Sequence, residues 1–163
     1  MVRIAADSGV LTAQIMIIVA ASGIFAWLLT VSQVPQAVSA AIAGSSPIMV
    51  LLMMNIVLLI AGMFLDPNSA QVILIPILYP IATAIGVDPV HFGMIVTTNL
   101  AIGMFTPPFG LNLFVAMGLF KVQFRDVVVA VLPFIWISLV ALVLVTWVPW
   151  ISLIVPRLAG YAG

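Results

Sequence analysis

The chain has 163 residues, of which 66% are hydrophobic and 5% are charged, and its formal net charge is zero. Because a soluble domain carries roughly 25% charged residues, this composition excludes a soluble globular protein. Zero net charge excludes the basic surface of a nucleic-acid-binding protein. The absence of cysteine excludes disulfides, zinc–thiolate sites and thiol catalysis. We therefore expect an all-α polytopic membrane protein, because its apolar stretches exceed the ~20 residues with which a helix crosses the hydrocarbon core.

The beginning of the chain predicts one spanning helix and one surface helix. Residues 11–31 predict a transmembrane helix, with Trp27 near the end where an indole can anchor at the membrane interface. Residues 33–44 are mildly polar and rich in small side chains, and they contain Pro35 close to their start. This composition indicates a short helix that lies at the membrane surface.

Two apolar runs follow within residues 48–86, separated by the sequence DPNS at 66–69. A charge, a proline and two turn-forming residues make this a strong turn signal. Two interpretations stay open from the residues alone. The runs are either two full spans joined by an exposed turn, or the arms of a re-entrant hairpin whose tip, 62–70, stays inside the membrane. Each arm has borderline length for a ~30 Å core.

Residues 93–120 predict a transmembrane helix that is broken over 103–110, where the sequence reads GMFTPPFG. Pro107 and Pro108 lack backbone N–H groups, and proline pushes the residue before it, Thr106, out of the helical region. Lipid cannot satisfy unwound backbone, so such a break must be buried in protein or line a wet cavity. Secondary transporters build ion and substrate sites in this way. After a short loop, residues 127–150 predict a final spanning helix.

The basic residues predict the orientation, because lysine and arginine prefer the cytoplasmic side. With Arg3 inside, the broken helix brings Lys121 and Arg125 back inside, and Arg157 lies outside. A re-entrant hairpin would then open from the outer, periplasmic face.

Four stretches resemble the large membrane subunit of tripartite ATP-independent periplasmic (TRAP) transporters. They are GMFLDPNSA at 62–70, PILYP at 76–80, GVDPVHFG at 86–93 and NLAIGMFTPPFGLNLF at 99–114. The resemblance covers nearly the whole chain but only the C-terminal repeat of that family. The chain is therefore expected to be a fragment, a truncated reading frame or one half of a split subunit.

The resemblance implies an elevator-type carrier of the bacterial inner membrane, built from two inverted repeats that each hold a re-entrant hairpin and a broken helix. It also implies coupling to Na⁺, uptake of organic acids such as C4-dicarboxylates or sialic acid, and no enzymatic activity. The implied partners are a small membrane subunit, a periplasmic substrate-binding protein and the N-terminal half of the large subunit. An alternative is a structural fragment without transport activity. A homodimer of single repeats is disfavoured, because it needs opposite orientations in one membrane.

The family pattern assigns a sodium site to Gly62, Gly103, Thr106 and Phe109, with the Phe109 carbonyl as the ligand. A helix break exposes carbonyl oxygens that can coordinate a cation. Thr106 adds a hydroxyl oxygen. The alternative interpretation is that these glycines, together with the prolines, only shape a kink.

Three neutral polar residues are candidates for binding the substrate carboxylate: Asn68 and Ser69 at the hairpin tip and Asn112 after the break. Asparagine and serine at such positions also cap helices, so this alternative stays open. Asp88 is expected at the interface, and His91 in a structural role rather than in proton transfer. No nucleophile–base pair and no metal-ligand cluster is apparent in the sequence.

Overall fold

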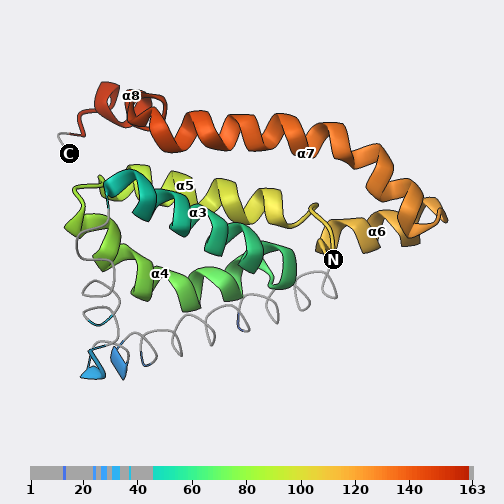
Figure 1. Ribbon diagram of the computed structural model, residues 1–163, viewed down its shortest axis with the longest axis horizontal. Coiled ribbons are helices and arrows are strands. Elements are labelled where there is room, and N and C mark those ends of the chain that lie inside the picture. Colours follow the sequence, from blue (N-terminus) through green and yellow to red (C-terminus); the bar gives the residue numbers. More distant parts are fainter. Residues whose placement is uncertain are drawn as a thin grey trace.

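The computed structural model describes residues 46–161, together with residues 13, 24, 27, 28, 31–33 and 37 of the preceding part. The helices expected over 11–31 and 33–44 lie outside the continuously described residues. Residues 46–161 form helices joined by short loops and contain no strand (Figure 1). The expectation of an all-α fold is thus confirmed for this part of the chain.

A helical hairpin opens the described part of the chain. It consists of α3 (Pro47–Phe64) and α4 (Pro67–Ala84). Both helices begin with a capping side chain followed by proline at the first helical position, Ser46 before α3 and Asp66 before α4. Proline suits that position, because its missing N–H is not needed in the first turn. The two expected apolar runs therefore become antiparallel helices joined by a turn of two residues (Figure 1).

The next two helices flank the break. α5 (Pro89–Gly103) is capped by Asp88, and α6 (Leu111–Phe120) begins after Gly110. α5 contacts α3, α4, α7 and α8, so it is the central helix of the described bundle. Its apolar face forms the core with α3, α4 and the α4–α5 loop; the fully buried members of that core include Leu58, Ile95 and Leu100.

The chain then runs back as α7 (Phe124–Trp147) and ends in α8 (Pro149–Leu158). A final helix was expected over 127–150; α7 begins three residues before that range and ends three residues before its end. The reason is Pro149, which disfavours helical backbone at the residue before it. Val148 accordingly has φ −118° and ψ 80°. The separate helix α8 was not anticipated from the sequence.

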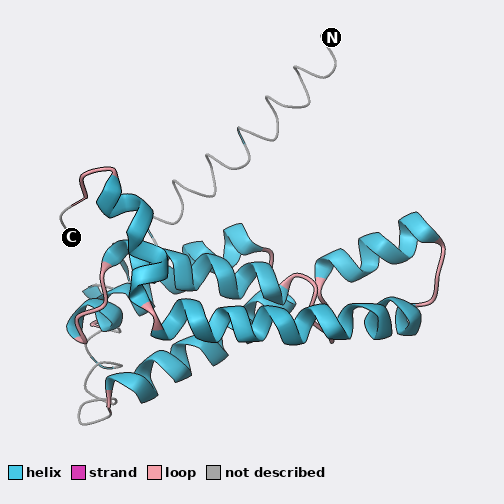
Figure 2. Ribbon diagram, turned by 90° about the horizontal axis from the view of Figure 1, so that it is seen from above, coloured by secondary structure: helices cyan, strands magenta, loops and turns pink. Residues whose placement is uncertain are grey.

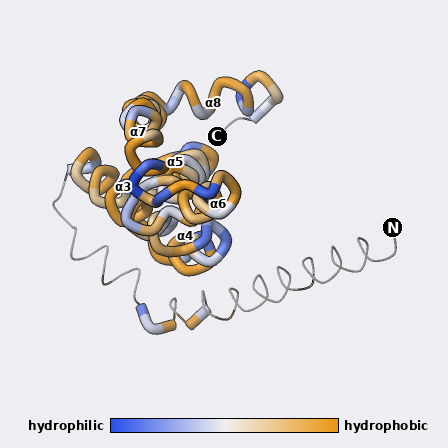
Figure 3. Tube along the Cα trace, turned by 90° about the vertical axis from the view of Figure 1, so that its right-hand side faces the viewer, coloured by the Kyte–Doolittle hydropathy of each residue, from blue (hydrophilic) through white to orange (hydrophobic). Residues whose placement is uncertain are grey.

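In the described part of the chain, two helices, α3 and α7, are long and apolar enough to cross a membrane by length and composition. Hydrophobic residues predominate along the helices of the described part (Figure 3), and many of their large side chains are exposed. Leu119 and Ile137, for example, are 73% and 68% exposed. Such a surface is unsuited to water and fits lipid or protein neighbours.

Candidate functional site

The hairpin and the broken helix meet at two glycines, Gly62 of α3 and Gly103 of α5, both of which are buried. A Cβ atom added to Gly103 would lie 2.6 Å from the Cα atom and 2.8 Å from the carbonyl oxygen of Gly62. A Cβ atom added to Gly62 would lie 3.0 Å from the Cα atom of Leu100. No other residue type allows this approach, so the glycines put the two backbones in direct contact.

This contact lies at the C-terminal ends of both helices, because α3 ends at Phe64 and α5 ends at Gly103. The carbonyl end of a helix carries a partial negative charge. Among the described residues, no N–H group donates to the carbonyl of Gly62. The preceding carbonyl, that of Ala61, accepts the N–H of Leu65 at 2.8 Å. The negative ends of α3 and α5 and the unpaired carbonyl oxygen of Gly62 therefore lie together at one buried position.

The first residues of the break still bond to carbonyls three or four positions earlier; the N–H of Thr106, for example, donates to the carbonyl of Gly103 at 3.0 Å. Thr106 is buried, and its hydroxyl donates to the carbonyl of Ile102 at 2.7 Å. Because the hydroxyl acts as the donor there, the lone pairs of its oxygen remain available. Gly110 has φ +35°, and a Cβ atom on it would lie 2.9 Å from the carbonyl oxygen of Thr106 and 3.1 Å from that of Met104. Carbonyl oxygens thus gather around Gly110.

Two contacts bind the break to the hairpin tip. The N–H group of Gly110 donates to the carbonyl of Met63 at 3.1 Å. The rings of Phe64 and Phe109 pack with their centroids 5.0 Å apart. The tip and the break are therefore parts of one structural unit, although these contacts join residues that are 45 and 47 positions apart in the sequence.

Three of the four predicted sodium ligands lie in this unit. Gly62 and Gly103 are in direct contact, and Thr106 is buried in the first turn of the break. The ring of Phe109 covers the tip, while the prediction concerned its carbonyl. The donors here are neutral carbonyl and hydroxyl oxygens, which suit a hard cation such as Na⁺. The described residues contain no group of three or more histidine, aspartate or glutamate side chains that could hold another metal.

The three predicted substrate residues lie in the first turns of two helices. Asn68 is exposed and Ser69 is partly buried in α4, and Asn112 is exposed in α6. The backbone N–H of Asn112 donates to the carbonyl of Met104 at 2.9 Å. Among the described residues, the side chains of Asn68 and Asn112 make no hydrogen bond. The structure places these residues at the positive ends of their helices, and among the described residues no hydrogen bond joins Asn112 to Asn68 or Ser69.

Asp66 caps α4 with its carboxylate, which accepts the backbone N–H of Ser69 at 3.0 Å. The carboxylate thereby satisfies one of the N–H groups in the first turn of α4 that have no partner within the helix.

We predict that Asp66→Ala lowers the free energy of unfolding by about 1 kcal/mol, the usual cost of a lost N-cap. Asp66→Asn keeps an oxygen acceptor and should cost much less. Thermal unfolding of both variants at pH 7 tests this expectation. Equal melting temperatures for the alanine and asparagine variants at pH 7 would contradict the capping role.

A buried polar network, which the sequence did not reveal, joins the helices α3, α5 and α7 close to the glycine contact. Asn55 of α3 accepts hydrogen bonds from Asn99 of α5 at 2.8 Å and from Thr146 of α7 at 3.1 Å. Asn99 is fully buried, and its Oδ1 atom has no partner among the described residues. The available signal was the presence of an amide within each of two mainly apolar helices, since buried polar side chains often join membrane helices.

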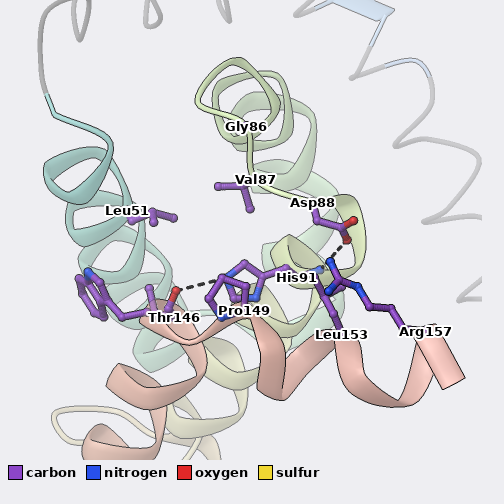
Figure 4. A pocket seen from close by; sticks show the side chains of 10 residues that line it. Leu51, Gly86, Val87, Asp88, His91, Thr146, Pro149, Leu153 and Arg157 are labelled. Carbon is purple, nitrogen blue, oxygen red and sulfur yellow. Dashed lines mark hydrogen bonds between the residues drawn. The ribbon is translucent and has the colours of Figure 1, made fainter. Parts of the chain in front are cut away.

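His91 links the network to the last helix. Its Nε2 atom lies 3.2 Å from the carbonyl oxygen of Thr146 (Figure 4). Its Nδ1 atom lies 3.1 Å from the hydroxyl of Ser152. Because a carbonyl only accepts, Nε2 carries the proton, and in the neutral ring Nδ1 accepts from Ser152. Beside His91 lies a cavity of about 330 Å³ that Asp88 and Arg157 also line.

The sequence matches the family model of the tripartite ATP-independent periplasmic transporter, DctM component, over residues 1–151. The chain belongs to the DctM family. It is 42% identical over 154 residues to the C4-dicarboxylate TRAP transporter large permease protein DctM of Vibrio cholerae, covering 93% of this chain and 34% of that protein. The resemblance found in the sequence is thereby confirmed, and the family is one of transporter permeases.

Other DctM relatives differ in the solute that their names give. The chain is 43% identical to the isethionate TRAP transporter permease protein DctMQ of Oleidesulfovibrio alaskensis, over 85% of this chain and 22% of that protein. It is 36% identical to the ectoine TRAP transporter large permease protein TeaC of Halomonas elongata, over 96% of this chain and 37% of that protein. The chain thus spans about a third of the length of most of the curated relatives it matches.

Proposed function

We propose that this chain supplies the ion-binding half of a sodium-coupled TRAP permease that takes up organic acids. The observation that carries this proposal is the backbone contact of Gly62 with Gly103, where the carbonyl ends of α3 and α5 meet. Neutral oxygens and two negative helix ends favour a small cation there. Thr106 and the carbonyl of Phe109 complete the proposed sodium site.

The same unit offers a place for the anionic solute. The N-terminal ends of α4 and α6 carry partial positive charge and expose Asn68 and Asn112 in their first turns. Ser69 adds a hydroxyl next to Asn68. In the described part of the chain, the basic residues are Lys121, Arg125 and Arg157, all outside the hairpin and the break. Helix ends, amides and the bound cation are therefore proposed to hold the solute carboxylate.

The transporter-level proposal rests on the family. We propose a multi-pass protein of the bacterial inner membrane, in which α3 and α4 form a re-entrant hairpin open to the periplasm and the whole unit moves as an elevator. A periplasmic binding protein would deliver the solute, and a small membrane subunit and the remaining part of the large subunit would complete the permease. The relatives' names support C4-dicarboxylates and other small organic solutes as the substrate class; sialic acid is a further candidate, suggested by the family resemblance.

Cysteine labelling tests the site, because the chain has no native cysteine. Asn68→Cys and Leu111→Cys place one thiol at each positive helix end, and Val122→Cys in the α6–α7 loop is the control. We expect Na⁺, but neither K⁺ nor choline, to slow maleimide labelling at the first two positions several-fold and to leave position 122 unchanged. Labelling is followed in vesicles, with and without the remaining part of a large subunit.

Protection by sodium that requires the remaining part would support a half-site completed by another segment. Equal labelling rates in all three salts, with the complementary part assembled, would contradict sodium binding. The glycine contact would then only shape the fold, and the chain would be a structural fragment.

A further inference from the structure

The last helix, α8, changes direction where α7 reaches the boundary of the membrane. α7 has 24 residues, which is about 36 Å at 1.5 Å per residue, against a hydrocarbon core of ~30 Å. Its end at Trp147 therefore lies near the membrane surface. Figure 3 shows α7 almost end-on while α8 runs sideways from it, and Figure 2 shows the same change of direction. A helix that crosses the direction of α7 here lies along the membrane plane.

Two opposite faces of α8 have different surroundings. Ser152 and Leu153 are buried, and Ser152 lies 3.1 Å from His91 of α5. The outward side chains Trp150, Val155 and Leu158 are 62%, 71% and 84% exposed. At about 100° per residue these three fall within an arc of roughly 140°, on the side away from the buried pair. One face is thus docked on the protein, and the other presents apolar side chains outward.

The chemistry of the outward face favours lipid as its neighbour. Apolar side chains exposed to water at this depth would be unfavourable, whereas the headgroup boundary accepts them together with tryptophan and arginine. Arg157 is exposed in the last turn and lines the cavity beside His91 together with Asp88. Among the described residues its guanidinium makes no ion pair or hydrogen bond, so it can also reach an anion at the surface. A phosphodiester headgroup is the anion that such a membrane surface supplies.

We propose that α8 is an interfacial helix that binds the phospholipid surface through Trp150, Val155 and Leu158, with Arg157 on a lipid phosphate. The bond between His91 and Ser152 fixes this helix to the first turn of α5. The beginning of the broken helix is thereby held at the level of the membrane surface. This role concerns the attachment of the bundle to lipid and does not depend on sodium binding.

Spin labels at single introduced cysteines test the proposal in phosphatidylcholine vesicles. Labels at Val155 and Leu158 should collide with oxygen more than with a water-soluble nickel complex, and should lie at equal, shallow depth. Ile137 in the middle of α7 is the deep control, and Val122 in the loop is the aqueous control. A spanning helix would instead place the two α8 labels about 4.5 Å apart in depth.

Three results would overturn the proposal. The first is nickel access at Val155 and Leu158 equal to that at Val122, and the second is a depth difference of the size expected for a spanning helix. The third is shielding of both labels from oxygen and from the nickel complex, which would mean that protein covers this face. Arg157→Glu should raise nickel access at Leu158 at least twofold, and Arg157→Lys should leave it unchanged. If nickel access at Leu158 were unchanged in Arg157→Glu, the proposed contact of Arg157 with a lipid phosphate would be wrong.

Discussion

Substituting Gly103 by alanine should abolish sodium-dependent protection of the hairpin tip and lower the stability of the bundle. The new Cβ atom would lie 2.6 Å from the Cα atom of Gly62, and the clashing atoms belong to the backbone. α3 and α5 must then separate, and overpacking of this kind costs about 1–3 kcal/mol. Thermal unfolding and the labelling rate of Asn68→Cys in Na⁺ measure the two effects.

Gly93→Ala provides the matched control, because Gly93 lies in the same helix and nothing stands within 4 Å of a Cβ atom there. Since alanine favours helix over glycine by up to about 1 kcal/mol, this variant should be as stable as the original chain or more stable. If Gly103→Ala and Gly93→Ala had equal melting temperatures, the close contact at Gly103 would not be required for the stability of the bundle. Protection retained in Gly103→Ala would separate ion binding from the glycine contact.

Replacing Asn55 by leucine should destabilise the bundle by about 1–3 kcal/mol for each buried donor that it leaves unpaired. Asn55 accepts hydrogen bonds from the amide of Asn99 and from the hydroxyl of Thr146. This single substitution therefore leaves one donor on α5 and one donor on α7 without their acceptor. Unfolding in mixed detergent micelles, followed by circular dichroism, measures the loss.

A pair of threonine variants isolates the hydrogen bond from the change in shape. Thr146→Val removes the donor to Asn55 and should cost about 0.6–2 kcal/mol, as interhelical bonds in membranes do. Thr97→Val makes the same change at an exposed position whose hydroxyl bonds only within α5, so it should have little effect. Equal losses in the two valine variants would show that the network adds no stability between helices.

The network and the glycine contact belong to the same pair of helices. Asn99 lies four residues before Gly103, and Asn55 lies seven residues before Gly62. Residues at these spacings share one helix face. The polar bonds therefore set the position of α3 on α5 one to two turns from the place where the carbonyl ends meet. We expect Asn55→Leu to weaken sodium-dependent protection as well, although less than Gly103→Ala.

The sequence by itself determined the features that depend on local backbone chemistry. Proline after a capping aspartate starts α4 at Pro67 and α5 at Pro89, and Pro107 with Pro108 prevents a helix over the break. Missing N–H groups and restricted dihedral angles act within a few residues. The apolar composition likewise predicted a membrane protein, and four short stretches carried the resemblance to the family that the comparison confirmed.

The tertiary structure alone decided which of these segments meet. The contact of Gly62 with Gly103, the bonds of Asn55 with Thr146 and the docking of α8 on His91 join residues that are 41 to 91 positions apart. No local preference encodes such pairs, because glycine and asparagine fit many backbone settings. Their roles arise only when packing removes the space for a Cβ atom or the water that would otherwise satisfy an amide.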